Sequence, residues 1–282
     1  MSGPGIGFKR MVVGLPQGLA SQAAIDAAAD LAEFLHIELL ATFLADATLP
    51  ALAGLSGARE LRSLEQGWQA IDRAQIAHDI NRAISAARRR FAESVRSRAV
   101  KTSFDVVTGA EAIASLIRAD DIVAVIEPAH PGERVTRQFT GLLEAAFEMA
   151  GAVLVVPRRI ARTTGPIMTV ASDSNSPDLH AALEIAAAFK ERLVVVTAAG
   201  THPPLKVLAE AERLGVQVEH IAVSGPLADA SSLAASAHLR ERLRVLSRSI
   251  LTDDAARLFS SLQGIPLLVI APSQAAPGAE NS

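Results

Sequence analysis

Three loops carry side chains that can bind a ligand or move a proton. The first, EPAHPGERVTRQFTGLLE (127–144), holds a histidine, two arginines and two glycines. Histidine titrates near neutral pH, so it can serve as an acid or a base. Arginine binds anions through its side chain, and glycine lets backbone amides approach an anion closely. The candidate ligand-binding residues of this loop are His130, Gly132, Arg134, Arg137 and Gly141.

The other two loops lie in the second half of the chain. One reads ASDSNS (171–176) and the other begins the segment LSRSILTDDAARLF (246–259). Their candidate ligand-binding residues are Asp173, Ser174, Asn175, Ser247 and Arg248. Each loop also has a purely structural interpretation. The arginines of 127–144 can be solvated surface residues, and Asp173 can form an Asx turn while Ser174 or Ser176 caps the following helix.

Sequence motifs for common catalytic and metal sites are absent. None of the seven histidines has HxxxH or HxH spacing, and the chain has no cysteine. These facts exclude a local histidine metal motif, a zinc–thiolate site and a cysteine nucleophile. Neither a GxSxG elbow nor a GxxxxGK[ST] loop occurs. An enzyme would need a convergent acid/base pair near Asp173 or His130, which is a matter of three-dimensional geometry and not of sequence; we expect that the protein is not an enzyme.

Composition excludes several classes of partner. The 282 residues carry a net charge of -3 and only 4% aromatic side chains, which argues against a nucleic-acid surface. The opening MSGPGIGFKR lacks the apolar core of a signal peptide, and no apolar run approaches the roughly 20 residues of a membrane span. We therefore expect a cytoplasmic protein that binds neither nucleic acid nor membrane.

Short apolar runs alternate with longer Ala- and Leu-rich helical patterns. Runs of consecutive Val, Ile and Leu are typical of strands covered on both faces. Strands are expected at 11–15, 37–44, 105–109, 121–127 and 152–157, and again at 166–172, 192–198, 216–225, 243–247 and 265–272. Helices are expected at 21–35, 58–98, 110–119, 139–150, 177–190, 204–214, 227–238 and 253–262. Strands that alternate with helices predict an α/β fold with parallel, doubly wound sheets.

The two halves of the chain have the same order of elements, which predicts an internal duplication. AAIDAAADLAEFL (23–35) aligns with AALEIAAAFKERL (181–193), and GAVLVVP (151–157) aligns with GIPLLVIAP (264–272). We expect domains at 8–158 and 165–272, each with a five-stranded parallel sheet. The small, polar tail 273–282 is expected to be disordered.

The final strands of the two halves are expected to pair with each other. AVLVV (152–156) and PLLVI (266–270) are apolar and would otherwise be exposed edges. Further association would then use another surface. The irregular segment Ala45–Ser63 is a candidate arm that contacts a partner. The alternative, that this segment packs on its own domain, has equal support from the sequence.

These features resemble those of a tandem universal stress protein. The resemblance rests on FKRMVVGL (8–15), AAIDAAADLAEFLHIEL (23–39) and GLLEAAFEMAGAVLVVP (141–157). It implies two universal-stress-type domains that pair with each other inside one chain. In that family, separate subunits pair in the same way. Nucleotide-binding members carry an aspartate after the first strand and a loop G-x2-G-x9-G-[S/T] after the fourth. In such a loop, backbone amides hold phosphates.

The chain departs from that nucleotide-binding pattern in both halves. In the first half, Pro16 stands near the aspartate position, Pro128 and Pro131 replace two loop glycines, and Leu142 replaces the serine or threonine. Proline has no amide to donate to a phosphate. The second half keeps Asp173 but has no glycine in 246–259. The sequence therefore predicts a degenerate nucleotide-binding site.

Three functions follow as hypotheses. The leading one is a non-catalytic, stress-related regulatory or binding protein that needs no cofactor and does not bind ATP in the family manner. The alternatives are a small-molecule or nucleotide-binding module with a cleft in the second domain, and a hydrolase-like enzyme. As for partners, we expect a homo-oligomer or an intramolecular pseudo-dimer.

Overall fold

The computed structural model describes most of the chain. The described residues are 7–15, 22–45, 48–61, 67–108, 110–128, 137–171, 176–224, 240–250 and 264–271. The helices expected at 227–238 and 253–262, and the tail 273–282, lie outside these ranges.

The first half contains seven strands and five helices among its described residues. In chain order they are β1 Arg10–Leu15, α1 Gln22–Phe34, β2 Glu38–Ala45, α2 Thr48–Leu52, β3 Arg59–Leu61, β4 Trp68–Ala70, α3 Arg73–Val95, β5 Thr102–Thr108, α4 Ala110–Leu116, β6 Asp121–Ile126, α5 Arg137–Met149 and β7 Ala152–Val156. β5 begins at Thr102 rather than at the expected Asp105.

The second half repeats the alternation of strand and helix. Its described elements are β8 Ile167–Val170, α6 Pro177–Phe189, β9 Leu193–Ala198, α7 Leu205–Leu214, β10 Val218–Val223, β11 Leu243–Ser247, the 3-10 turn η3 Arg248–Ile250 and β12 Leu267–Ile270.

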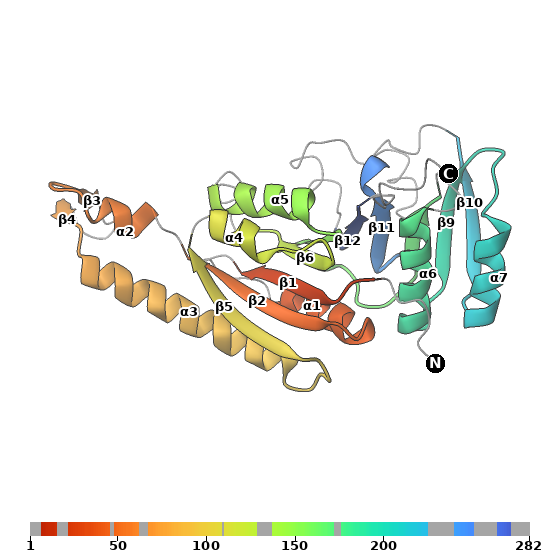
Figure 1. The fold of residues 1–282 in the computed structure, drawn as a ribbon, viewed down its shortest axis with the longest axis horizontal. Helices are drawn as coiled ribbons and strands as arrows, with labels where there is room; N and C mark the ends of the chain where they lie inside the picture. The colour runs from red at the N-terminus through yellow and green to blue at the C-terminus, as the bar shows by residue number, and fades with distance from the viewer. Residues whose placement is uncertain are drawn as a thin grey trace, which may run out of the picture.

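The sheet contains two five-stranded parallel units joined edge to edge (Figure 1). The strand order is β10-β9-β8-β11-β12-β7-β6-β1-β2-β5. Within each half, the order counted along that half's own main-sheet strands is therefore 3-2-1-4-5. β12 and β7 pair antiparallel at the centre, so the two predicted parallel sheets form one ten-stranded sheet.

Helices cover both faces of this sheet. One buried cluster joins the strands to α1, α3, α6 and α7, and a second joins their other face to α4 and α5. Because the strands are covered on both sides, every residue of β6, β7, β8, β11 and β12 is buried. This burial accounts for their unbroken apolar sequences.

The expected helix over 58–98 is wrong in its first part. The helix α3 begins at Arg73, where Asp72 caps it by accepting hydrogen bonds from the amides of Ala74 and Gln75. The preceding residues instead form a small antiparallel hairpin of β3 and β4. Together with α2 and the start of α3, this hairpin forms an arm that projects from the sheet (Figure 1).

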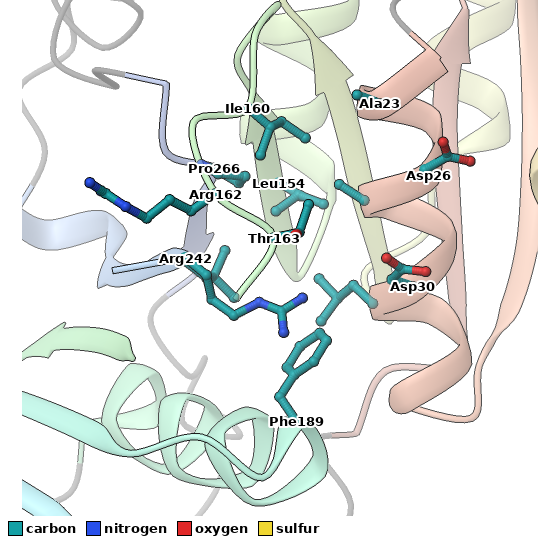
Figure 2. A pocket seen from close by; sticks show the side chains of 13 residues that line it. Ala23, Asp26, Asp30, Leu154, Ile160, Arg162, Thr163, Phe189, Arg242 and Pro266 are labelled. Carbon is teal, nitrogen blue, oxygen red and sulfur yellow. The ribbon is translucent and has the colours of Figure 1, made fainter. Parts of the chain in front are cut away.

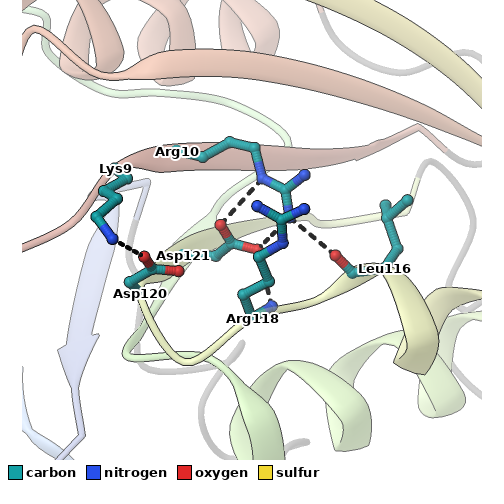
Figure 3. Close-up of polar contacts among 6 residues, drawn as sticks. All are labelled: Lys9, Arg10, Leu116, Arg118, Asp120 and Asp121. Atoms are coloured by element: carbon teal, nitrogen blue, oxygen red, sulfur yellow. Dashed lines mark hydrogen bonds and ion pairs between the residues drawn. The ribbon is translucent and has the colours of Figure 1, made fainter.

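A buried ion pair holds the amino ends of β1 and β6 together (Figure 3). The Arg10 guanidinium donates through Nε and Nη2 to the two carboxylate oxygens of Asp121, at 3.0 and 2.6 Å. Arg10 also donates to the carbonyl of Leu116, and the amide of Arg118 donates to Asp121. The hydrogen bond to Asp121 raises the pKa of Arg10. Both carboxylate oxygens of Asp121 and two nitrogens of the Arg10 guanidinium are therefore hydrogen-bonded, which offsets the cost of burying the pair.

The register of the central pairing can be tested by cross-linking. Val153 and Val269 are Cα partners whose side chains belong to the same buried cluster. Directly opposed antiparallel residues lie about 4.5–5.5 Å apart at Cα, which suits a disulfide. We expect the double variant Val153→Cys/Val269→Cys to form an intramolecular disulfide on mild oxidation, seen by intact mass and thiol titration.

The matched control is Val153→Cys/Leu268→Cys, because Leu268 faces the other side of the sheet, with Leu154. This pair should stay reduced. The chain has no native cysteine to compete in either variant. Equal cross-linking of both pairs would contradict the register.

Candidate functional site

The geometry of the second half places a candidate site at the carboxyl ends of β8 and β11. These two strands are neighbours, and the strand order reverses between them. In open parallel sheets, ligands bind outside the carboxyl ends of strands at such a reversal. Ser247 ends β11 here, and α6 begins beside β8 at Pro177.

Asp178, in the first turn of α6, is the most unusual residue of this site. Its side chain is 0% exposed, and Ser176 Oγ donates a hydrogen bond to its Oδ1. Its other oxygen, Oδ2, is buried and has no hydrogen-bond partner among the residues that the structure describes. No cationic side chain of the described chain forms an ion pair with it. A buried carboxylate without a cation is expensive, so such a group is an unusual feature of a folded protein.

Burial raises the pKa of Asp178 to about 6. Backbone amides at the start of α6, and that of Ser247, act in the opposite direction by hydrogen bonding to the carboxylate. Their effect is smaller than that of desolvation. Asp178 therefore changes protonation close to neutral pH and can accept or donate a proton at its unpartnered oxygen.

The structure brings Ser247 to Asp178 but directs Arg248 elsewhere. Ser247 is buried, and its hydroxyl lies 2.8 Å from that of Ser249. The Arg248 guanidinium lies over the ring of Phe147, 5.5 Å from its centre. Since Phe147 belongs to α5, Arg248 contacts the first half of the chain.

Several residues expected in the site lie outside the described part of the chain. These are Asp173, Ser174, Asn175, His130, Gly132 and Arg134. Arg137 is the first residue of α5, and Gly141 lies inside that helix rather than in a loop before it. The acid/base pair that an enzyme would need near Asp173 or His130 also falls on undescribed residues.

The equivalent position in the first half is filled by a side chain. Gly14 lies near the carboxyl end of β1, where it pairs with Val125 of β6. A Cβ at Gly14 would lie 2.5 Å from Leu142 Cδ2, so the leucine packs directly on the glycine backbone. Leu142 is only 3% exposed. The sheet reversal of the first half is thus covered by an apolar side chain from α5.

A smaller polar cluster lies on the neighbouring strands of the second half. Thr197 Oγ1 lies 2.8 Å from His220 Nε2, and the rings of His202 and His220 are 5.5 Å apart. Within the described ranges, no group of three or more His, Cys, Asp or Glu side chains can hold a metal ion. No described helix is long and apolar enough to cross a membrane.

Sequence reasoning missed Asp178 because an acidic residue after Pro177 is typical of any helix start. The helical spacing did contain the signal. Asp178 shares one face of α6 with Ala182 and Ile185, at i, i+4 and i+7, and that face is buried. An acidic residue on an otherwise apolar stripe indicates a buried carboxylate.

Comparison with solved structures identifies the fold. A universal stress protein from Archaeoglobus fulgidus DSM 4304 superposes with a TM-score of 0.60 at 11% identity, over 93% of this chain and 96% of that one. A functionally unknown protein from Pseudomonas aeruginosa PAO1 gives 0.47 at 15% identity, over 95% and 94%. A universal stress protein in complex with cAMP gives 0.32 at 16% identity, over 54% and 98%.

The chain therefore has the α/β fold of the universal stress proteins, as its sequence pattern predicts. The likeness is one of structure, since the identities are low. The sequence matches no protein-family model and no curated protein.

The burial of Asp178 predicts a pH-dependent stability. Between pH 3.8 and about 6 the unfolded chain ionises Asp178 first, so the folded state loses stability as pH rises. The neutral variant Asp178→Asn lacks this loss. Its stability relative to the wild type should be up to about 3 kcal/mol more favourable at pH 7.5 than at pH 4. Urea unfolding followed by circular dichroism measures this difference.

Asp79→Asn is the matched control, because it removes the same charge from an exposed position on α3. The stability difference between this variant and the wild type should be similar at both pH values. A pH-independent difference for Asp178→Asn would contradict the buried position of its carboxylate.

Proposed function

We propose that the protein is a non-catalytic, stress-related regulatory or binding protein of the cytoplasm. Its two universal-stress-type domains would span 8–158 and 165–272 and descend from one duplicated unit. The shared strand order of the two halves and the fold of the Archaeoglobus fulgidus protein support this proposal. The function requires no cofactor.

The contact between Leu142 and Gly14 carries the proposal. A triphosphate needs several fixed donors, which a glycine loop supplies through its amides. Here an apolar side chain occupies the point where β1 and β6 end, and Pro128 offers no amide. The first domain therefore does not bind ATP in the family manner. Its remaining role is structural or regulatory.

Calorimetric titration of the full chain with Mg-ATP tests this conclusion. Each missing hydrogen bond to a charged group weakens binding by roughly 1.5–3 kcal/mol. Three such losses turn a micromolar site into one of about millimolar affinity or weaker. We expect no saturable binding below about 1 mM. A low-micromolar dissociation constant that Arg134→Gln/Arg137→Gln abolishes would show that side chains replace the loop, and would overturn the proposal.

A small-molecule site in the second domain is the second candidate function. The unpartnered Oδ2 of Asp178 favours it, because a ligand hydroxyl or amide could donate to this oxygen. A carboxylate in this position disfavours phosphate groups. Native mass spectrometry of the full chain should then reveal a carried ligand that Asp178→Asn loses. Identical spectra for both variants would remove this candidate.

The projecting arm is our proposed surface for self-association. Leu55 and Trp68 are 63% and 62% exposed there. A cavity of about 430 Å³ also opens between α2 and α3. We propose that a second copy of the chain covers this surface, since the edge strands β7 and β12 already hydrogen-bond to each other and are not available for a partner.

Native mass spectrometry of the full chain tests this proposal. It should show a dimer that Trp68→Ser dissociates and that Val106→Thr, on the exposed edge strand β5, leaves intact. A monomeric wild type would contradict the proposal.

A further inference from the structure

A second cavity lies on the seam between the two halves, away from the carboxyl ends of the strands (Figure 2). Its volume is about 150 Å³. One wall is α1 of the first half, and the opposite wall is the end of α6 and the start of β11 in the second. The segment connecting the halves contributes Ile160 and Thr163. Every ligand bound here would therefore touch both halves.

The lining of this cavity is mainly apolar. Leu31, Leu154, Ile160 and Phe189 supply most of the large side chains. The ring of Phe189 also packs on Phe34 with centroids 4.2 Å apart, which fixes its position between α1 and α6. A mainly apolar cavity of this size can accept a compact hydrophobic group.

One cation, Arg242, points into the cavity. Its guanidinium lies 3.9 Å from the centre of the Phe189 ring, and Figure 2 shows the side chain directed toward α1, the helix that carries Asp30. Arg242 is half-buried, and desolvation lowers its pKa against the opposing influence of Glu191 and Asp30. Among the residues that the structure describes, none forms an ion pair with it. The fork of donors on Arg242 is therefore free of a carboxylate partner.

The nearby acidic groups are already engaged elsewhere. Asp30 Oδ1 accepts from Arg98 Nε and Nη2 at 2.8 and 2.7 Å, and Asp26 lies 3.6 Å from the same guanidinium. Glu191 accepts a hydrogen bond from the amide of Gly165 at 2.9 Å. Within the described part of the chain, Arg242 therefore lines the cavity without an ion-pair partner of its own.

We propose that this seam cavity binds a small monocarboxylate with a compact apolar body. Arginine pairs with carboxylates through two parallel hydrogen bonds, and the contact with the Phe189 ring restrains the position of the guanidinium. A cavity of about 150 Å³ accepts a group of roughly the size of benzene. The site therefore suits a ligand of the size of benzoate.

The electrostatics select a single negative charge. Asp26 and Asp30 also line the cavity, where Arg98 contacts both carboxylates and Asp30 offsets part of the positive charge of Arg242, so a dianion such as phosphate would be undercompensated among apolar walls. A cation would be repelled by Arg242 and would have to displace Arg98 from its carboxylates. A neutral apolar molecule would fit the walls but leave the guanidinium without a partner.

This site is independent of the candidate site at Asp178. Arg242 precedes β11 and Ser247 ends it, so the length of that strand, roughly 16 Å, separates them. The inference therefore does not depend on the proposed function of either domain.

Titration of the full-length protein with benzoate, followed by methyl NMR, tests the proposal. We expect saturable shifts of the methyl groups of Leu31, Leu154 and Ile160, with a dissociation constant on the order of 1 mM or tighter. Benzylamine and benzyl alcohol, which share the ring but not the charge, should bind at least about tenfold more weakly. Trp68 lies on the distant arm, so its signals should not move.

Two variants locate the interaction. Arg242→Gln should weaken benzoate binding by about tenfold or more, because a charge-assisted pair is lost. Arg213→Gln is the matched control, since this exposed arginine of α7 does not line the cavity, and the affinity of this variant for benzoate should change less than about twofold. Ala27→Leu, which fills the cavity from α1 without changing the charge, should abolish binding.

Three results would overturn the proposal. The first is the absence of saturable shifts at benzoate concentrations up to about ten times the expected constant. The second is equal or tighter binding of benzylamine. The third is an equal effect of the two arginine variants, or unchanged binding in Ala27→Leu, in samples whose remaining methyl signals show the native fold.

Discussion

The antiparallel pairing of β7 with β12 is the constraint on which the rest of the structure depends. Each of these strands ends a five-stranded unit and would otherwise expose a row of unsatisfied backbone groups. Their pairing satisfies both edges within one chain and places α1 next to α6 across the seam. The ring contact between Phe34 and Phe189 and the cavity beside Arg242 both follow from this arrangement.

The two halves share one strand order but carry different side chains at the point where that order reverses. At the sheet reversal of the first half, Leu142 lies directly on the Gly14 backbone and excludes other groups. At the equivalent reversal in the second half, the Asp178 carboxylate is buried, and one of its oxygens has no hydrogen-bond partner in the described ranges. A filled reversal contributes hydrophobic stability, whereas a buried unpaired acid reduces stability above its pKa. The first half is therefore stabilised by an apolar side chain at its sheet reversal, whereas the second half keeps a carboxyl group at the equivalent place.

Much of the fold was predictable because strands buried on both faces leave an unbroken apolar signal. Runs such as those of β6, β7 and β12 were placed correctly, and so was the pairing of the two final strands. The start of α3 was not, because the hairpin before it contains residues compatible with either structure and only Asp72 marks the boundary. The candidate site was predicted less well. Ser247 lies in it, but Asp178 reads as an ordinary helix start until its face of α6 is known to be buried.

The buried charges of the molecule separate into two kinds, and this difference decides which of them can bind. Near the amino ends of the central strands, Arg10 pairs with Asp121 and Arg244 pairs with Glu241, so each charge is compensated within the fold. Within the described residues, Glu241 Oε2 and the neutral hydroxyls of Thr42 and Thr169 also lack hydrogen-bond partners, but Glu241 keeps Arg244 as its ion-pair partner. Asp178 and Arg242 differ from all of these, because neither has an ion-pair partner among the described residues.

A compensated pair gains little from a ligand, since binding would have to replace an existing interaction. An uncompensated group gains the full interaction, because its desolvation has already occurred on folding. Asp178 is suited to a hydrogen-bond donor and Arg242 to a monoanion. Because they lie at opposite ends of β11, occupancy of either would stabilise the same central strand by mass action, without any movement between them.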